Sequence, residues 1–274
     1  MTSSRLDSTK RVRLADVTLV AVSSVAIPAT IRALEACLGQ VDFAATLFLT
    51  DQELPDDRHP DIQQRKIAPI RSLADYSRFM TRSLVDHVET SHLLCVQWDG
   101  YLLDSRNWDE QFLAFDYIGA PWPHFMDGHD VGNGGFSLRS RRLLEACIDL
   151  PAEADVAEDI LIGRVWRDEL ERRGIRFAPR DVAARFAFER SVPVGNELGF
   201  HGVFNLVNLL SAADGLHLIK SLEPELIARN ERRELVRWAA RRGRWRLLLE
   251  LANKLIFDRT ARAVRAHRRG ENFV

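Results

Sequence analysis

Several hydroxyl and acidic side chains follow directly after short apolar segments. Ser23 and Ser24 end the segment VTLVAV, Asp51 ends AATLFLT, and Asp99 follows HLLCVQW. Short, β-rich apolar runs are typical of buried strands, so each of these side chains is expected at the carboxyl end of a strand. Ligands of open α/β sheets bind outside those ends. We therefore expect these residues to meet on one rim, which is the first candidate for a binding site.

A glycine-rich segment lies in the middle of the chain. Residues 117–140 contain five glycines and two prolines in 24 positions, which predicts a loop region with short strands, where function usually resides. Around Asn133, the glycines Gly132, Gly134 and Gly135 permit positive backbone dihedrals and let a ligand approach the main chain closely. Asn-Gly is also typical of a tight turn between two strands, and the pattern alone favours that turn.

Two further groups of polar residues have ordinary explanations beside a functional one. Glu158 and Asp159 open a predicted helix, where the helix dipole alone favours carboxylates. The loop also contains several potential metal ligands, His124, Asp127, His129 and Asp130. A solvated turn is the usual reason for such a composition, and no helical His-x-x-x-His pair indicates a metal site.

The elements that must position these residues alternate between short strands and helices, the pattern of an α/β domain. The expected strands cover residues 17–22, 44–50 and 92–98, with a short one at 65–70. A helix is expected from Pro28 to Gly39, and further helices over 73–88, 140–150 and 157–174. From Pro224 onward the chain is expected to be helical to its end.

The composition excludes some classes of protein. A chain of 274 residues with 46% apolar and 28% charged residues can bury a full core, so disordered and fibrous classes are excluded. The formal net charge of -1 excludes a general polyanion binder. Residues 231–274, however, contain 13 basic and 5 acidic residues, an excess of 8, and residues 1–230 balance it with -9.

The cysteines and the N-terminal residues indicate the cellular compartment. Cys37, Cys95 and Cys147 are odd in number and lie in apolar sequence, which argues against a disulfide framework or a CxxC zinc site. The N-terminus has no apolar run of signal-peptide length, and no window approaches 18 uncharged apolar residues. We expect a cytoplasmic protein without a membrane span.

Five motifs together resemble a protein family. They are DYSRFMTRSLVDHVETSHLLCVQWDGYLLD (75–104), YIGAPW (117–122), GNGGFSLRS (132–140), AED (157–159) and GFHG (199–202). In GT-A glycosyltransferases a Tyr-x-Arg helix precedes a strand that ends in an Asp-x-Asp metal motif, and here Gln97-Trp98-Asp99 occupies that place. The combination, over roughly residues 16–205, resembles an uncharacterised bacterial family of GT-A-like glycosyltransferases. Each motif alone is weak.

The resemblance implies a GT-A-like fold, with a mixed central sheet flanked by helices, that binds a nucleotide-sugar donor. The residues it implies for donor binding are Ser23, Asp51, Tyr76, Arg78, Gln97, Trp98, Asn133, Gly134 and Gly135. Arg78 has the fork geometry to bind phosphate and equally suits a solvated helix face. Tyr76 suits base stacking, although an amphipathic helix also explains a tyrosine there.

The resemblance also implies a divalent metal, Mn²⁺ or Mg²⁺, held by Asp99 and His201. Such an ion neutralises the charge that develops on a departing diphosphate. Because Gln97 replaces the first Asp of the metal motif, the dependence on metal is left open. For His201, a loop histidine without a ligand is the alternative.

By the same resemblance, Asp159 is the first choice for the general base of an inverting transfer and Glu158 the second. A retaining enzyme would not need that base, so the stereochemistry is left open. The implied acceptor is a glycan or glycolipid, including a cell-surface polysaccharide. The alternative is a protein that keeps the fold and binds a nucleotide or a sugar without catalysis, which the amide at Gln97 favours.

The C-terminal basic segment completes the expected organisation: a tail over residues 1–15, a catalytic domain over 16–230 and a helical extension over 231–274. Apolar residues fall at helical spacing on one side of the extension: Leu235, Trp238, Trp245, Leu249, Ala252 and Ile256. Such a helix suits an anionic membrane surface, which would place the protein at the inner face of the membrane. A closing helix packed on the catalytic domain is the alternative that the pattern favours. Nucleic-acid binding is the weakest option, because no recognised module is present.

Overall fold

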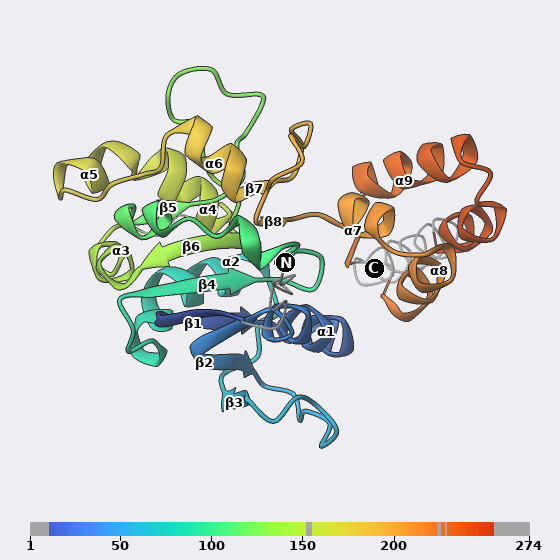
Figure 1. Ribbon diagram of the computed structural model, residues 1–274, viewed down its shortest axis with the longest axis horizontal. Helices are drawn as coiled ribbons and strands as arrows, with labels where there is room; N and C mark the ends of the chain where they lie inside the picture. The colour runs from blue at the N-terminus through green and yellow to red at the C-terminus, as the bar shows by residue number, and fades with distance from the viewer. Residues whose placement is uncertain (1–10, 152–154, 224–225, 228, 255–274) are drawn as a thin grey trace, which may run out of the picture. The chain divides into compact units, whose positions relative to one another are not determined.

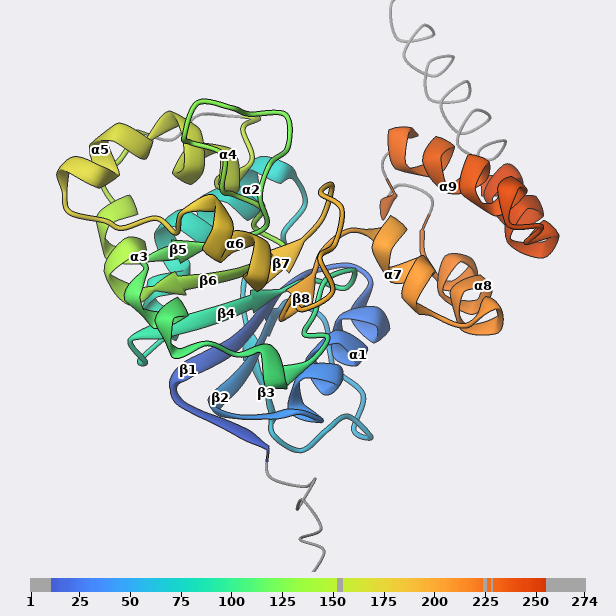
Figure 2. The same cartoon turned by 45° about the horizontal axis from the view of Figure 1, so that its top comes forward.

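The computed structural model describes residues 11–151, 155–223, 226–227 and 229–254. The chain forms two compact units, Met1–His201 and Gly202–Val274. Each unit has its own elements, which Figures 1 and 2 show from two directions. The expected division into residues 1–15, 16–230 and 231–274 stays a prediction, and parts of its first and last segments lie outside the described residues.

A six-stranded sheet is the centre of the first unit (Figure 1), with the strand order β3-β2-β1-β4-β6-β5. The strands are β1 (Val12–Val22), β2 (Val41–Thr50), β3 (Ile62–Lys66), β4 (His92–Val96), β5 (Tyr117–Ile118) and β6 (Phe136–Ser140). The first four run parallel, and β6 runs antiparallel to both β4 and β5. Because β1 pairs with β2 on one side and with β4 on the other, the topology of the sheet reverses between β1 and β4.

Both faces of the sheet are covered, which explains why the central strands are apolar almost throughout. Successive side chains of β1 point to opposite faces. Leu19 and Ala21 pack into the cluster that contains α1 (Ile27–Leu38) and α6 (Arg180–Phe186). Val20 and Val22 pack into the cluster on the other face, with residues that follow α2 (Leu73–Arg78) and with α3 (Arg141–Cys147).

The remaining elements of the first unit are short. They are a π-helical turn at Phe79–Ser83, 3-10 turns at Leu84–His87, Ser105–Asn107 and Glu110–Ala114, α4 (Glu158–Ile160), a π-helical turn at Leu161–Val165, and α5 (Arg167–Arg172). A second, two-stranded parallel sheet pairs β7 (Ala187–Phe188) with β8 (Gly199–Phe200). This small sheet ends at the candidate site.

The second unit is helical. Its elements are α7 (Val203–Leu209), α8 (Ala212–Ser221), α9 (Arg229–Arg241) and a helical stretch over residues 245–254. Leu235, Ala239, Leu247 and Leu251 are buried within it. In the part of the chain that the structure describes, none of the helices combines the length and the apolar character that a membrane crossing requires.

The expected architecture, a mixed central sheet flanked by helices and followed by C-terminal helices, is confirmed. Some boundaries differ. β1 begins five residues before the expected segment, because Val12, Arg13 and Leu14 also pair with β2. The third strand covers residues 62–66 rather than 65–70, and the helix expected over 73–88 changes to π-helical and 3-10 turns after Arg78. The three cysteines are buried and free.

Candidate active site at the ends of the parallel strands

A hollow with a cavity volume of about 160 Å³ opens where β1 and β4 end. Its polar wall comes from Ser23 and Ser24 after β1, Tyr76 on α2, and Gln97 and Trp98 after β4. Aliphatic side chains form most of the remaining wall: Val22, Val25, Ile70 and Val96. The hollow lies at the point where the sheet topology reverses, which is where open α/β sheets bind ligands.

The turn after β4 presents two of the predicted residues. Gln97 and Gly100 exchange backbone hydrogen bonds, with N–O distances of 3.3 and 3.1 Å, so Trp98 and Asp99 occupy a tight two-residue turn. The side chain of Gln97 donates through Nε2 to the hydroxyl of Tyr76 at 2.9 Å. Its oxygen Oε1 lies 3.2 Å from Nε2 of His201. Gln97 thus links the hollow to the neighbouring cluster around His201.

His201 reaches this cluster because of the small parallel sheet. In that sheet Phe188 pairs with Phe200, so the next residues, Glu189 and His201, emerge at the same end. The backbone N–H of His201 donates to the carbonyl of Phe188 at 3.0 Å, which fixes the position of the histidine. Its ring then lies between two carboxylates: Nε2 is 3.4 Å from Oδ1 of Asp99, and Nδ1 is 3.5 Å from Oε1 of Glu189.

The two carboxylates determine the charge of the imidazole. Burial alone would lower the pKa of His201, but Asp99 and Glu189 together hold it well above its usual value. In turn the pKa of Glu189 is lowered, because the hydrogen bond from His201 and its charge outweigh the effect of burial. The imidazole is therefore favoured as a cation between Asp99 and Glu189, and a metal ion bound at Nε2 would replace its proton.

The atoms around Nε2 of His201 fit a divalent metal. Oδ1 of Asp99 is buried and has no hydrogen-bond partner among the described residues. This oxygen lies 3.4 Å from Nε2 of His201, and Oε1 of Gln97 lies 3.2 Å from the same nitrogen. Ligand atoms bound to one divalent ion at about 2.2 Å lie about 3 Å from each other, so these separations suit neighbouring ligands. Glu189 on the opposite ring nitrogen is the kind of carboxylate partner that metal-binding histidines commonly have.

Asn133 and two glycines complete the cluster from the start of β6. Asn133 adopts the left-handed region at φ 70°, which asparagine tolerates, and its Oδ1 accepts the N–H of Gly135 at 3.0 Å. Its Nδ2 lies 3.0 Å from Nδ1 of His201. A Cβ on Gly135 would collide with the His201 ring, and one on Gly134 with the carboxylate of Glu158. These two glycines therefore admit neighbouring side chains.

Glu158 is buried in an ion pair. Its Oε1 accepts from Nη2 of the fully buried Arg139 at 2.9 Å. The same guanidinium donates to Oγ of Ser137 at 3.0 Å and to the carbonyl of Gly134 at 3.3 Å. This arrangement ties the turn that opens α4 to the start of β6.

Asp159, the next residue, turns toward the glycine segment. Its Oδ2 accepts the backbone N–H of Gly134 at 3.2 Å, and its Oδ1 accepts that of Ile160 at 2.8 Å. Burial, and secondarily the charge of Glu158, raise the pKa of Asp159 to about 6. A half-buried carboxylate with this pKa suits a general base near neutral pH.

The other predicted residues lie around this core. Ser23 closes its own loop, since its Oγ accepts the N–H of Val25 at 3.1 Å. Asp51 lies at the end of β2, where the hydroxyl of Ser24 is the main cause that lowers its pKa. Arg78 is exposed on α2. The structure thus brings Tyr76, Gln97, Asp99, Asn133, Gly134, Gly135, Asp159 and His201 into one connected group, with Ser23 and Trp98 on the adjoining wall.

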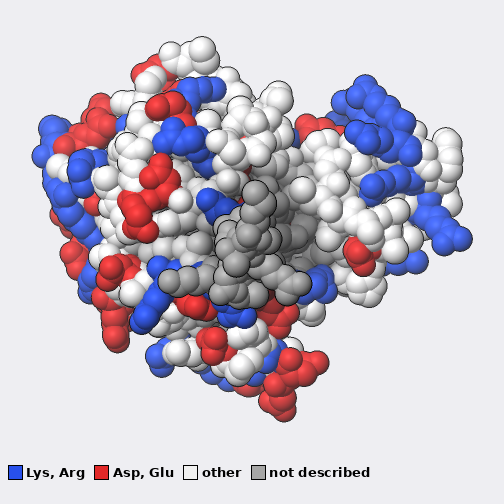
Figure 3. Space-filling model, viewed as in Figure 1, with Lys and Arg blue, Asp and Glu red and all other residues white. Residues whose placement is uncertain are grey.

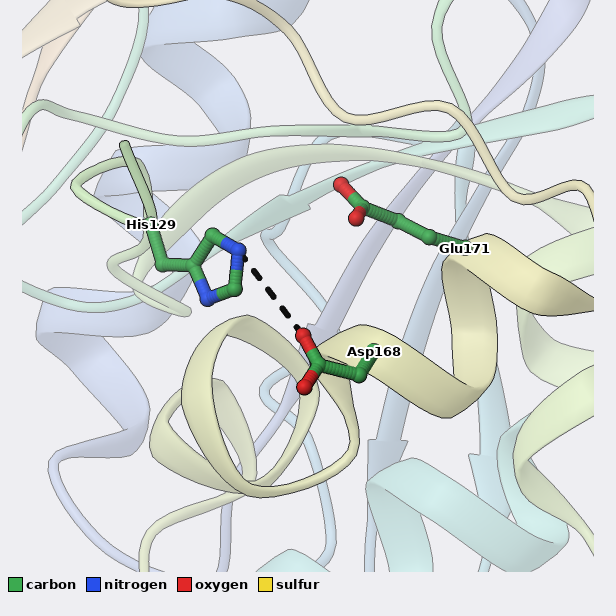
Figure 4. Close-up of side chains that lie close together, drawn as sticks. All are labelled: His129, Asp168 and Glu171. Atoms are coloured by element: carbon green, nitrogen blue, oxygen red, sulfur yellow. Dashed lines mark ion pairs between the residues drawn. The ribbon is translucent and has the colours of Figure 1, made fainter. Parts of the chain in front are cut away.

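The histidine- and aspartate-rich loop is arranged differently. Asp127 pairs with Arg164 at 2.7 Å, and Asp130 pairs with Arg180. Figure 4 shows His129 facing Asp168 and Glu171 of α5, with Nε2 of His129 at 3.9 Å from Oδ1 of Asp168. These three could hold a metal ion, but both carboxylates are exposed and Glu171 already accepts from Arg167 at 2.7 Å.

Sequence reasoning missed Glu189 and Arg139. Glu189 follows a strand of only two residues, too short for a periodic signal. Arg139 stands within the strand FSLRS, where an arginine suggests an exposed face. The motif GNGGFSLRS that contains Arg139 was the only available signal for it.

A family model described as a protein of unknown function (DUF5672) matches residues 61–201. No curated protein matches the chain. The solved structures similar to it include the mannosyltransferase PcManGT from Pyrobaculum calidifontis in complex with GDP-Man and Mn²⁺, with 12% identity, a TM-score of 0.43, and coverage of 97% of this chain and 82% of that one. They also include the apo form of the glycosyltransferase GlyE from Streptococcus pneumoniae TIGR4, with 14% identity and a TM-score of 0.42. That match covers 70% of this chain and 54% of GlyE.

Proposed function

The chain belongs to the DUF5672 family of proteins of unknown function, and we propose that it is a glycosyltransferase that moves a sugar from a nucleotide-diphosphate donor to a glycan or glycolipid acceptor. One observation carries the proposal. The ligand set of Gln97, Asp99 and His201 adjoins the hollow at the topology reversal, and Asp159 is connected to it through Gly134 and Asn133. A charged ligand site and a carboxylate base thus occur side by side.

The hollow and the ligand set suit the two ends of a nucleotide diphosphate. Tyr76 and Trp98 offer aromatic surface in a largely aliphatic wall, which suits a nucleoside. Asp99, Gln97 and His201 would hold the divalent ion. When bound, that ion would neutralise negative charge on the diphosphate leaving group. Glu189 and Asn133 orient the His201 ring toward Asp99 and Gln97.

Asp159 is proposed as the base that accepts the proton of the acceptor hydroxyl, which corresponds to an inverting transfer. Its pKa of about 6 leaves it deprotonated at neutral pH and still basic enough to accept a proton. The N–H groups of Gly134 and Ile160 hold the carboxylate in position. Glu158 is engaged with Arg139, so Asp159 is the better placed of the two carboxylates.

A two-stage experiment tests the proposal. Purified protein is first screened against nucleoside-diphosphate sugars by thermal shift, with and without Mn²⁺, and the hits are then tested for donor hydrolysis. We expect a ligand-dependent rise in Tm that Mn²⁺ increases, followed by slow release of nucleoside diphosphate. Saturable binding without any turnover, even with candidate acceptors, would favour the non-catalytic binding protein, which the amide of Gln97 supports. The absence of any shift would reject both functions.

A further inference from the structure

The second unit carries an exposed surface that is basic and partly apolar, formed by Arg233, Arg237, Arg241, Arg242, Trp245, Arg246 and Leu249. We call it the Arg-Trp surface. In residues 233–253, all of which the structure describes, every one of these side chains is exposed, whereas the acidic side chains of Glu234 and Glu250 are half-buried. Trp245 and Leu249 are each 64% exposed. Figure 3 shows blue side chains gathered over α9 and the residues after it.

The apolar side of α9 is already used for packing within the unit. Leu235 and Ala239 are fully buried, and the ring of Trp238 lies 6.2 Å from that of Phe204 and 4.7 Å from the Arg244 guanidinium. The apolar residues expected on one side of a single helix are therefore divided between two helical segments. Those on α9 pack into the core of the second unit, whereas Trp245 and Leu249, on the following helical residues 245–254, are exposed.

Trp245 and Leu249 occupy positions i and i+4, so their side chains share one side of the helix. The arginines at 241, 242 and 246 are close to them in the sequence and are also exposed. Such an apolar pair, exposed to water beside several cations, matches the boundary of an anionic bilayer. There the apolar groups enter the acyl region and the guanidinium groups contact the lipid phosphates. A nucleic acid would pair with the arginines but would leave the aliphatic Leu249 unburied.

We propose that the Arg-Trp surface binds the anionic surface of a lipid bilayer, with Trp245 and Leu249 inserted below the phosphates. The charge complementarity extends beyond this surface, since residues 231–274 carry an excess of 8 positive charges. The proposal does not depend on the reaction assigned to the first unit.

The test measures cosedimentation of the full-length protein with vesicles of phosphatidylcholine, alone or with about 30% phosphatidylserine. We expect binding to the mixed vesicles at low salt, its loss at about 1 M salt as charges are screened, and none to phosphatidylcholine alone. Each Arg→Gln substitution at 233, 237 or 241 should weaken the partition coefficient about fivefold. Trp245→Ala should weaken it by at least as much.

A matched control is Val192→Ala, because Val192 is an apolar side chain that is 87% exposed but lies in the first unit. We expect no effect of this change on vesicle binding. Vesicles with brominated acyl chains provide a second readout: quenching of tryptophan fluorescence should disappear in Trp245→Phe, because Trp245 is the tryptophan that inserts. Equal circular dichroism and Tm establish that the variants are folded. The proposal is overturned if the wild type does not bind the mixed vesicles, if the substitutions leave binding unchanged, or if only oligonucleotides bind.

Discussion

At the residue scale, the site depends on side chains that hold one another in place through charge. The imidazole of His201 lies between Asp99 and Glu189, and Asn133 contacts the same ring. Asp159, which accepts the N–H of Gly134 next to Asn133, has a raised pKa because it is buried beside Glu158. The first group favours a cation and the second favours a proton acceptor, so substitutions in each should affect different measurements.

Replacing Asp159 by Asn should abolish most turnover but leave donor binding intact. The amide keeps the shape of the carboxylate but cannot accept the proton, so turnover should fall about 10²- to 10⁴-fold with little change in the KM for the donor. In the wild type, kcat should rise with pH through about 6 as Asp159 loses its proton, and this limb should be missing in the variant. Initial rates between pH 4.5 and 8 with an identified substrate pair provide the measurement. Near-wild-type turnover in the variant would contradict the assignment.

Asp99→Ala should weaken the binding of Mn²⁺ and of a nucleoside diphosphate without unfolding the protein. The substitution removes the buried carboxylate oxygen that lies 3.4 Å from Nε2 of His201. Isothermal titration calorimetry with a nucleoside diphosphate and Mn²⁺ should detect a loss of at least tenfold. The matched control is Asp168→Ala, which alters the exposed group around His129 in Figure 4. Equal affinities of wild type and Asp99→Ala would exclude Asp99 as a ligand.

Gly135→Ala should displace His201. The added Cβ would collide with the imidazole ring, and overpacking of this kind costs about 1–3 kcal/mol of unfolding free energy. Mn²⁺ affinity, measured by electron paramagnetic resonance of the free ion, should also fall. Gly39→Ala is the control, because a Cβ there meets only ordinary contacts at 3.4 Å and φ is -62°. If both variants retain stability and affinity, the glycine is not needed to admit the histidine.

At the scale of elements, a buried ion pair joins α4 to β6. Arg139 is fully buried and Glu158 nearly so, so water screens neither charge strongly. Removing one member of such a pair leaves the other charge buried without a partner. The resulting loss of stability usually exceeds the stability that the intact pair contributes. The pair therefore maintains the approach of Asp159 to Gly134 that the two elements provide.

Glu158→Gln should lower the free energy of unfolding by about 3 kcal/mol, because the guanidinium of Arg139 would lose its countercharge in the interior. The turnover of the folded variant should change far less than that of Asp159→Asn. Urea denaturation followed by circular dichroism measures the first effect. Glu145→Gln is the control: it breaks a 2.9 Å ion pair with Arg141 that is half exposed, so a change within about 0.5 kcal/mol is expected. Similar losses in both variants would contradict this account.

Much of the element pattern was predictable from the sequence, because buried strands and α1 have strong local signals. The end of β1 before Ser23 and the end of α1 before Gly39 follow from apolar runs bounded by polar or glycine residues. The strand β4 ends at Val96, two residues before the expected end at Trp98. The convergence of Glu189, His201 and Asn133 was not predictable, since it depends on the pairing of two-residue strands 12 positions apart. The role of Gly134 and Gly135 was likewise hidden, because only the structure identifies the side chains that approach them.

At the scale of the whole molecule, all the residues assigned to the candidate site belong to the unit that ends at His201. The basic excess belongs to residues 231–274. The proposed reaction and the proposed membrane contact are thus carried by different units of one chain.

A fragment of residues 1–201 should therefore fold and bind nucleoside diphosphate with Mn²⁺, whereas vesicle binding should be lost. The expected catalytic domain over 16–230 makes a different prediction, namely that α7 and α8 are needed for ligand binding. Calorimetry on fragments 1–201 and 1–230 distinguishes them. Equal affinity of the two fragments for the nucleoside diphosphate supports a boundary after His201. Binding by only the longer fragment supports the boundary near residue 230.

Because β6 runs antiparallel to β4, the segment before β6 and the turn after β4 lie at the same end of the sheet. Val96 at the end of β4 pairs with Phe136 at the start of β6, so the turn with Asp99 and the segment with Asn133 leave adjacent strands at one edge. Their separation is set by ladder hydrogen bonds, which keep paired strands about 4.8 Å apart. The largely exposed loop over residues 123–129, which lies between them in the sequence, can therefore gain or lose length while the spacing between the two halves of the site stays the same.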